Sequence, residues 1–278
     1  MVRRIGKHGV RQVQFFNFVG GINVSQAPEQ IAENELVLCD NFLYETNGKR
    51  LVGRGGLSEP CARFDVQVRE LFYDVDTNLV FVFLDNGQAF SMLNSGESVR
   101  HIGTVTGNAV PKCCKFMNKL WVASGGKLQF YDFGEASTLQ LVTDSPLCDF
   151  AFVRFGRLGV TLAGDDRCSF SGIGDGAYWI ENTNDASAMA WLDVGYGDSG
   201  DIVAVVPLAT DLLFLKSNGM IYQLSGINSP DSWVVNCISS DADVRGVHSA
   251  INIGNSTLFI SERGIKSVQA TMDYGNIN

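Results

Sequence analysis

The residue types that most often carry out catalysis or hold metals are scattered along this sequence. His8, His101 and His248 lie far apart, and no two of them have the spacing of a metal-ligand pair. The signatures G-x-S-x-G, H-E-x-x-H and G-x-x-x-x-G-K-[ST] do not occur. We therefore expect no catalytic residue, no metal site and no bound cofactor.

Carboxylates gather in three places, each of which has a functional and a plainer interpretation. Asp165–Asp166 and "GYGDSGD" (195–201) could bind Ca²⁺, but the EF-hand spacing with its closing Glu is absent, so we favour Asp/Gly turns. Glu33 and Glu35 lie in a segment that could form one short helical turn. They would suit a glycosidase only if another acid faced them across a cleft.

Basic side chains gather near the N-terminus, in "VRRIGKHGVR" and "KRLVGRG". They could contact phosphates, or they could dock on an acidic neighbouring protein, and we favour the second interpretation. The candidates for such contacts are Arg3, Arg4, Lys7, Arg11, Lys49, Arg50 and Arg54.

The charge of the chain argues against tight nucleic-acid binding. The formal net charge is −9, from 21 basic and 30 acidic residues. Residues 1–17 hold four of the bases and no acid, so the rest of the chain has 17 bases against 30 acids, a formal −13. Since gripping DNA requires clusters of Lys and Arg, we expect DNA to pass this protein without sticking.

The cysteines and the opening residues indicate where the chain is made. Seven cysteines without a C-x-x-C pair, and no apolar core or cleavage site in "MVRRIGKHGVRQVQFF", predict reduced thiols and synthesis in a cytoplasm. No run of 18 apolar residues is present, so no membrane span is expected.

The elements that position these residues follow a repeated pattern: an apolar run, a short polar turn and a second apolar run. The pattern occurs at 77–93, 118–133, 156–172, 210–226 and 255–270, with anchoring leucines spaced 41, 38, 54 and 46 residues apart. Turns such as DNG, SGGK, SNG and ERG place glycine where a hairpin needs a positive φ. A further apolar run precedes each hairpin, and a weaker extended piece follows most of them.

Three or four strands in each unit of roughly 45 residues favour the blades of a β-propeller. The alternative is a long β-sandwich or two stacked ones. We predict an all-β chain with five blade-like repeats, in which the fifth unit lacks its outer strand; an incomplete six-bladed propeller is the other interpretation.

The repeats also predict the domain organisation. Residues 1–60 form an extended N-terminal arm and residues 61–278 the propeller body, with a long loop insertion at about 173–200. The insertion is rich in Gly, Asp and Asn, and we expect Tyr178, Trp179 and Trp191 to be exposed on it as a contact surface.

The opening stretch, "FVGGINVSQAPEQIAENELVLCDNFLYETNGKRLVGRGGL", resembles the N-terminus of a known family. That family comprises the tail hub or nozzle proteins of short-tailed bacteriophages, also called head-to-tail stabilisation proteins or tail tubular protein B. "RCSFSGIGDGAYW" is similar to its "YFSG-x-GDP-x-x-W" pattern, and the stretches at 198–226 and 254–268 resemble its central blades. The residues carrying the N-terminal resemblance are Gly20, Gly21, Ile22, Asn23, Pro28, Ile31, Asn34, Glu35, Asp40, Asn41, Gly48, Arg54, Gly56 and Leu57.

The resemblance implies a virion protein without catalytic activity, assembled in the host cytoplasm. It implies a propeller hub that forms a hexameric ring below the portal and adaptor, retains the genome and surrounds the channel for double-stranded DNA. The seven basic residues would then contact a neighbouring subunit or the adaptor. The chain is short for this family, and no distal nozzle domain is visible in it.

Two other functions are compatible with a propeller, because a fold does not determine a function. One is a glycosidase acting on host surface sugar, which would need a funnel of acids, Arg and aromatic residues. The other is a ligand-binding propeller outside phage biology.

Overall fold

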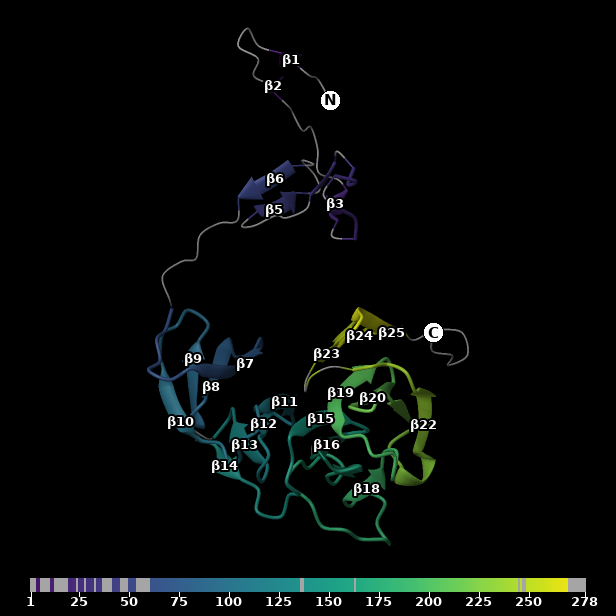
Figure 1. Cartoon of the computed structure of the whole chain (residues 1–278). Helices are drawn as coiled ribbons and strands as arrows, with labels where there is room; N and C mark the ends of the chain where they lie inside the picture. The colour runs from purple at the N-terminus through teal and green to yellow at the C-terminus, as the bar shows by residue number, and fades with distance from the viewer. Residues whose placement is uncertain are drawn as a thin grey trace. The chain divides into compact units, whose positions relative to one another are not determined.

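In the computed structural model the chain divides into two compact units, an N-terminal unit of residues 1–60 and a body of residues 61–278 (Figure 1). Each unit is described by itself. The residues that the structure describes are 4–5, 11–12, 20–23, 25–27, 29–32, 34–36, 42–45, 50–53, 61–135, 138–162, 164–244, 246 and 249–269.

The N-terminal unit, expected to be extended, contains short local strand pairs. In chain order these are the antiparallel pair β1 (Arg4–Ile5) with β2 (Arg11–Gln12), the parallel pair β3 (Gly21–Ile22) with β4 (Glu35–Leu36), and the antiparallel pair β5 (Phe42–Glu45) with β6 (Arg50–Gly53).

The described residues of the body form five successive antiparallel sheets, here called blades one to five. Each blade is a meander in which every strand pairs with the next one along the chain. Blade one holds β7 (Val68–Asp74), β8 (Leu79–Leu84), β9 (Gln88–Leu93) and β10 (Arg100–Thr104), and blade two holds β11 (Lys112–Phe116), β12 (Lys119–Ala123), β13 (Gln129–Asp132) and β14 (Gln140–Leu141). Blade three holds β15 (Phe150–Arg154), β16 (Arg157–Thr161), β17 (Arg167–Phe170) and β18 (Ala190–Asp193), and blade four holds β19 (Ile202–Leu208), β20 (Asp211–Lys216), β21 (Ile221–Ser225) and β22 (Val234–Ser239). Blade five holds β23 (Ala250–Ile253), β24 (Ser256–Ser261) and β25 (Gly264–Gln269).

The hairpin turns form where the sequence placed glycine. Gly87 and Gly219, which follow Asn in the second turn of blades one and four, have φ of 82° and 86°. An L-residue with a side chain rarely adopts this conformation, so the Asn-Gly pairs end one strand and start the next. The predicted hairpins therefore become the second and third strands of each blade.

The core lies between the blades, where the apolar faces of neighbouring sheets meet. Phe81 and Phe83 of blade one pack against Leu120 and Val122 of blade two. Equivalent clusters join blades two and three, three and four, and four and five. Each fully buried Leu or Phe stabilises the fold by about 1.5–3 kcal/mol relative to exposure, so these layers hold the blades side by side. Face-to-face packing of successive four-stranded meanders is the predicted β-propeller arrangement.

Ion pairs reinforce the contact between the first strands of blades one and two. Lys115 Nζ lies 2.8 Å from Asp74 Oδ1 and 2.7 Å from Asp76 Oδ2, and Lys112 Nζ lies 3.4 Å from Glu70 Oε2. Burial acts to raise the pKa of Asp74, but hydrogen bonds from Lys115 and Thr77 outweigh it, and the net pKa is lowered.

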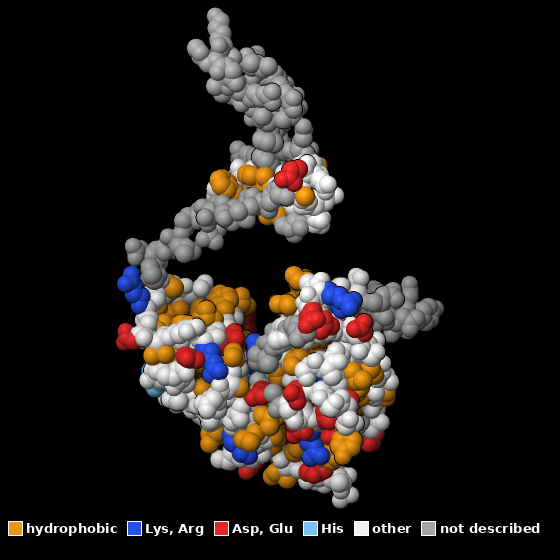
Figure 2. All heavy atoms as spheres, in the orientation of Figure 1, with side chains coloured by type: hydrophobic (Ala, Val, Ile, Leu, Met, Phe, Trp, Pro, Cys, Tyr) orange, Lys and Arg blue, Asp and Glu red, His pale blue; other side chains and the backbone are white. Residues whose placement is uncertain are grey.

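Blade five has three strands among the described residues, as the repeat pattern predicted, and one of its faces is uncovered. Phe259 and Val268 pack against blade four. The opposite face exposes Ile251, Ile260 and Ile265, at 61%, 54% and 76% of their surface. A recess separates this face from blade one, and apolar side chains lie on both sides of it (Figures 1 and 2).

The loop insertion predicted at about 173–200 is partly wrong. Residues 190–193 form β18, the outer strand of blade three, with Cys168 opposite Leu192 and Ser169 opposite Trp191. Its aromatic and apolar residues pair with β17, so β18 interrupts the insertion, which is irregular before this strand and again over residues 194–200.

Candidate functional site

The motif that opens the chain folds back on itself. Gly21 lies opposite Glu35 in the β3–β4 pair, and the backbone N–H of Gly20 donates to Asn34 O at 3.0 Å. Asn23 closes the loop twice, with its N–H donating to Leu36 O at 2.9 Å and its Nδ2 donating to Glu35 Oε2 at 3.0 Å. The glycines and "NEL" thus form one local structure, although they are separated by a dozen residues.

Glu35 stabilises this turn as a hydrogen-bond acceptor. Its carboxylate accepts from Asn23 and, at 2.9 Å, from the N–H of Ala32, and these two bonds lower its pKa. The helical turn expected here is wrong for Glu35, because it lies in β4 and its partner strand is β3. Glu33 lies outside the described residues. A Cβ on Gly20 would come within 2.4 Å of Glu35 Cγ, so only glycine fits beside this side chain.

None of the seven basic candidates has a described side chain. Arg3, Lys7, Lys49 and Arg54 lie outside the described residues. Arg4, Arg11 and Arg50 lie in β1, β2 and β6, where the structure describes the backbone alone. Their proposed role in contacts with a neighbouring protein stays a prediction.

The three aromatic candidates do not form one exposed surface. Trp179 is buried at 5% exposure among Trp121, Leu158 and Val160, so the expectation that it is exposed is wrong. Its indole N–H donates to Gly176 O at 2.9 Å. A Cβ on Gly176 would lie 2.5 Å from the Trp121 ring, and glycine therefore lets this stretch pack closely onto blade two.

Trp191 is 41% exposed, and its ring lies 3.9 Å beneath the Arg167 guanidinium. Tyr178 is half-buried beside Gly172. Of the three candidates, Trp191 alone is available for contacts.

Arg157, which sequence reasoning did not single out, anchors the insertion. Its side chain is fully buried, and Nη1 donates to Ser171 O at 2.7 Å. The same guanidinium donates to the carbonyls of Ala186 and Ala188. Its five donors allow one arginine to satisfy several carbonyls of an irregular segment at once.

The two acidic stretches proposed as alternatives for Ca²⁺ or for turns surround a buried lysine. Lys216 is fully buried, and its Nζ lies 2.6 Å from Asp166 Oδ1 and 2.5 Å from Asp198 Oδ1. It also donates to Val194 O at 3.0 Å. We call Lys216, Asp166, Asp198 and Tyr222 the lysine cluster.

Tyr222 completes the lysine cluster by donating its hydroxyl to Asp198 Oδ2 at 2.9 Å. Burial, together with this hydrogen bond, raises the pKa of Tyr222 to about 12. Burial acts to raise the pKa of Asp198, but hydrogen bonds from Lys216, Gly200 and Tyr222 leave it lowered. The acidic loops therefore hold blades three and four together.

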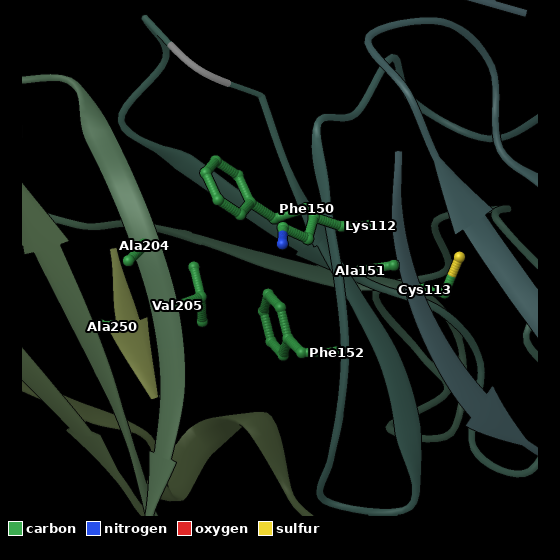
Figure 3. Close-up of a pocket in the computed structure, with 8 residues that line it drawn as sticks. All are labelled: Lys112, Cys113, Phe150, Ala151, Phe152, Ala204, Val205 and Ala250. Carbon is green, nitrogen blue, oxygen red and sulfur yellow. The ribbon is translucent and has the colours of Figure 1, made fainter. Parts of the chain in front are cut away.

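A small cavity of about 170 Å³ lies where the first strands of blades two to five converge (Figure 3). Phe150, Phe152 and Val205 supply apolar walls, and the ammonium group of Lys112 points into the space between them. Cys113 also lines it, but burial, with smaller contributions from Cys114 and Glu70, raises the pKa of its thiol well above the usual range. A thiol held protonated is a poor nucleophile, so this cavity suits a small apolar or anionic group rather than covalent chemistry.

The described residues contain neither a cluster of metal ligands nor a membrane-spanning helix. No three His, Cys, Asp or Glu side chains gather there in a way that could hold a metal ion. Within the same residues, no helix is long and apolar enough to cross a membrane.

Comparison with known proteins supports the fold alone. No family model and no curated protein matches this sequence. Among solved structures, the chain is similar to PorZ, a surface component of the type-IX secretion system of Porphyromonas gingivalis. The identity is 14%, the TM-score 0.50, and the match covers 86% of this chain and 33% of PorZ.

Two further structures match at similar levels. One is the β-propeller domain of Myceliophteria thermophila Swd1, at 11% identity and TM-score 0.51, covering 77% of this chain and 70% of that one. The other is YCF48 bound to a D1 peptide, at 12% identity and TM-score 0.50, covering 71% of this chain and 63% of that one. The chain thus spans about a third of PorZ, and the predicted β-propeller fold is confirmed.

Proposed function

We propose that this protein is a structural subunit of the tail of a short-tailed bacteriophage, where copies assemble into a ring below the portal and adaptor. In this proposal the ring is a hexamer in the virion, assembled in the host cytoplasm. It retains the genome, surrounds the path of the exiting DNA and catalyses no reaction. The resemblance of "GGIN…NEL…DNF" to that family supports it, as does the local turn that these residues form.

The observation that carries the proposal is the uncovered face of blade five. Ile251, Leu258, Ile260 and Ile265 line a shallow hollow of about 290 Å³ on this face. In blades one to four the corresponding face is buried against the next blade. A contiguous apolar patch of this kind is typical of a surface that another protein covers, and in the proposed ring it is covered by a second copy.

A channel for DNA would lie between the subunits of such a ring. The cavity where the first strands converge holds about 170 Å³, equivalent to a sphere roughly 7 Å across, and is too small for a duplex whose major groove alone is about 12 Å wide. The seven basic side chains of the N-terminal unit are proposed to contact a neighbouring subunit or the adaptor. In this proposal the basic side chains bind a neighbouring protein and do not pair with the acidic body of their own chain.

The test is the mass and shape of the purified protein, by light scattering after gel filtration and by electron microscopy. We expect rings for the natural sequence and smaller species for Ile260→Thr combined with Ile265→Thr, since threonine keeps strand propensity but removes apolar surface. Val234→Thr, at a 50% exposed position on β22, is the matched control and should still form rings. A monomer for the natural sequence, or unchanged rings for the double variant, would contradict the proposal.

The glycosidase hypothesis has its own test. Release of reducing sugar from host polysaccharide by the purified protein would contradict a non-catalytic role. No observation on the described residues favours this hypothesis or a ligand-binding role outside phage biology over the structural one.

A further inference from the structure

A groove of about 660 Å³ lies at one end of blades three and four, away from the uncovered face of blade five. Its walls come from three connections: the turn between β15 and β16, the turn between β19 and β20, and the connection that follows β21. They contribute Arg154, Phe155, Gly156, Thr210, Gly226, Ile227 and Asn228. Two neighbouring blades and three turns therefore build one site.

The two arginines that flank the first of these turns are used differently. Arg157 is fully buried and donates to the carbonyls of the insertion. Arg154 is half-buried, and its guanidinium makes no hydrogen bond or ion pair with a described residue. The enclosed Nε is unpaired in both arginines, so they differ in the terminal nitrogens, which donate in Arg157 and not in Arg154. The Arg154 guanidinium lies 5.1 Å from the Phe155 ring centroid. The structure thus holds a cation in place at the groove without supplying the anion it would normally bind.

Asp211, the acid whose charge acts on Arg154, already accepts two hydrogen bonds. Asp211 accepts from Thr210 Oγ1 at 3.3 Å and from Gln223 Nε2. Burial lowers the pKa of Arg154, and the charge of Asp211 opposes this shift. No ion pair joins these two described side chains, so Arg154 keeps its donors for a ligand.

The backbone under Arg154 is held in a strained form. Phe155 has φ 55° and Gly156 has φ 67°, which makes a two-residue turn of the kind that usually carries Asn-Gly. The Phe155 ring stacks on Trp233 at 5.1 Å with 23° between the planes, and it is 7% exposed. This packing fixes the turn, and with it the position of Arg154.

Exposed apolar side chains lie in the groove and next to it. Ile227 is 69% exposed within it. Ile173 Cγ2 lies 3.8 Å from where a Cβ on Gly156 would be, and Met117 Cε lies at the same distance from that position on Gly174. We call Arg154 and Ile227, which line the groove, together with Ile173 and Met117 the strip; it combines one cation with apolar groups from blades two to four.

We propose that this strip binds an extended polypeptide segment that carries a carboxylate between two apolar side chains. The carboxylate accepts hydrogen bonds from Arg154, and the apolar side chains cover Ile227 on one side and Ile173 with Met117 on the other. The exposed groups favour a peptide over a sugar, because they are aliphatic and the one aromatic ring in the groove is buried against Trp233. This partner is distinct from the second copy proposed at blade five.

The probe is the peptide Ac-Leu-Ser-Asp-Ser-Leu-NH₂, which in an extended form presents Leu, Asp and Leu on one side. Its matched control has Asn in place of Asp. Binding is followed by NMR, from the arginine Nε–Hε signals of the full chain. We expect a saturable shift of the Arg154 signal, and about fivefold weaker binding of the Asn peptide because a charge-assisted hydrogen bond becomes a neutral one.

Variants assign the effect to the groove. Arg154→Gln should weaken the Asp peptide to the level of the Asn peptide, and Arg154→Lys should give an intermediate affinity because it keeps the charge without the planar fork. Arg167→Gln, at another arginine of blade three that lies on an aromatic ring, should leave binding unchanged. Arg154→Lys also keeps the test available if Arg154→Gln fails to fold.

Three results would overturn the proposal. One is equal affinity for the Asp and Asn peptides, and another is no saturable shift at about 10 mM peptide. The third is a shift of the Arg154 signal by a glucose hexasaccharide but not by the peptide. None of these outcomes depends on ring formation, so a failure here is distinguishable from a failure of the proposed tail function.

Discussion

At the scale of single residues, this protein uses its buried charges to hold loops in place. Arg157 and Lys216 are both fully buried, and both donate to backbone carbonyls of irregular segments. A buried charge without a partner is strongly unfavourable, so each such side chain fixes the groups around it. Arg154 differs from them because no acceptor meets it among the described residues.

The thiols provide a prediction at this scale. Burial raises the pKa of Cys148 to about 12 and keeps the thiols of Cys114 and Cys168 protonated, whereas Cys61 and Cys237 are exposed. We expect iodoacetamide at neutral pH to label Cys61 and Cys237 quickly and the other three only after unfolding, since the thiolate reacts.

Peptide mapping by mass spectrometry measures the labelling site by site. Denatured protein is the control, in which all sites should react at similar rates. Fast labelling of Cys148 or Cys168 in the folded protein would contradict the packing between blades described above.

At the scale of elements, the connections between blades contribute to the stability of the fold as the strands do. The lysine cluster joins the β17 side of blade three to β20 and β21 of blade four through Asp166, Asp198 and Lys216. Its members come from two loops and two strands, so the free energy of unfolding should depend on it strongly.

Lys216→Met should lower the free energy of unfolding by about 3 kcal/mol, because it leaves Asp166 and Asp198 without their buried counter-charge. Lys119→Met is the matched control. Its ion pair with Asp132 is 3.7 Å long and partly exposed, so the loss there should be below about 1 kcal/mol. Urea unfolding followed by tryptophan fluorescence measures both, and equal losses would contradict a special role for the lysine cluster.

The pH dependence of the same measurement gives a second readout. The pKa of Asp198 is lower in the folded state than its ordinary 3.8, so its contribution is present above that value. It is lost as the pH falls through the lower folded pKa. Asp198→Asn should therefore lose stability less steeply than the natural sequence as the pH falls below about 3.8. Parallel curves would show that Asp198 does not carry this dependence.

At the scale of the whole molecule, the distribution of charge bears on the proposed passage of DNA. Outside residues 1–17 the chain has 17 bases against 30 acids. Acids such as Asp166 and Asp198 share the charge of Lys216 within the fold, and salt screens distant charges, so repulsion would come chiefly from acids that face the channel.

We expect the purified protein to bind double-stranded DNA more weakly than about 10⁻⁵ M at low salt, because few phosphates can be neutralised. Fluorescence anisotropy of a labelled duplex at two salt concentrations tests this. Tight binding with a steep salt dependence would favour a DNA-gripping role instead. A variant without residues 1–17 would show whether the basic segment causes any binding that is observed.

The sequence by itself determined the β-propeller, because blade formation depends on local patterns. Alternating apolar runs and glycine at the hairpin turns specify each meander within about 45 residues, and the three described strands of blade five follow the same pattern. It also placed Gly20, Asn23 and Glu35 in one motif, although it misjudged the structure that Glu35 adopts.

Only the tertiary structure decided which polar and aromatic residues are free to act. The packing of Trp179 on Trp121, the strand β18 and the burial of Lys216 between two acidic loops depend on contacts between blades, at separations that no local pattern encodes. The same holds for Arg154, whose neighbours Thr210 and Ile227 lie more than 50 residues away in the chain. Burial and the presence of a partner are properties of the packed blades, and these decide whether a charge holds the fold together or is left to bind something else.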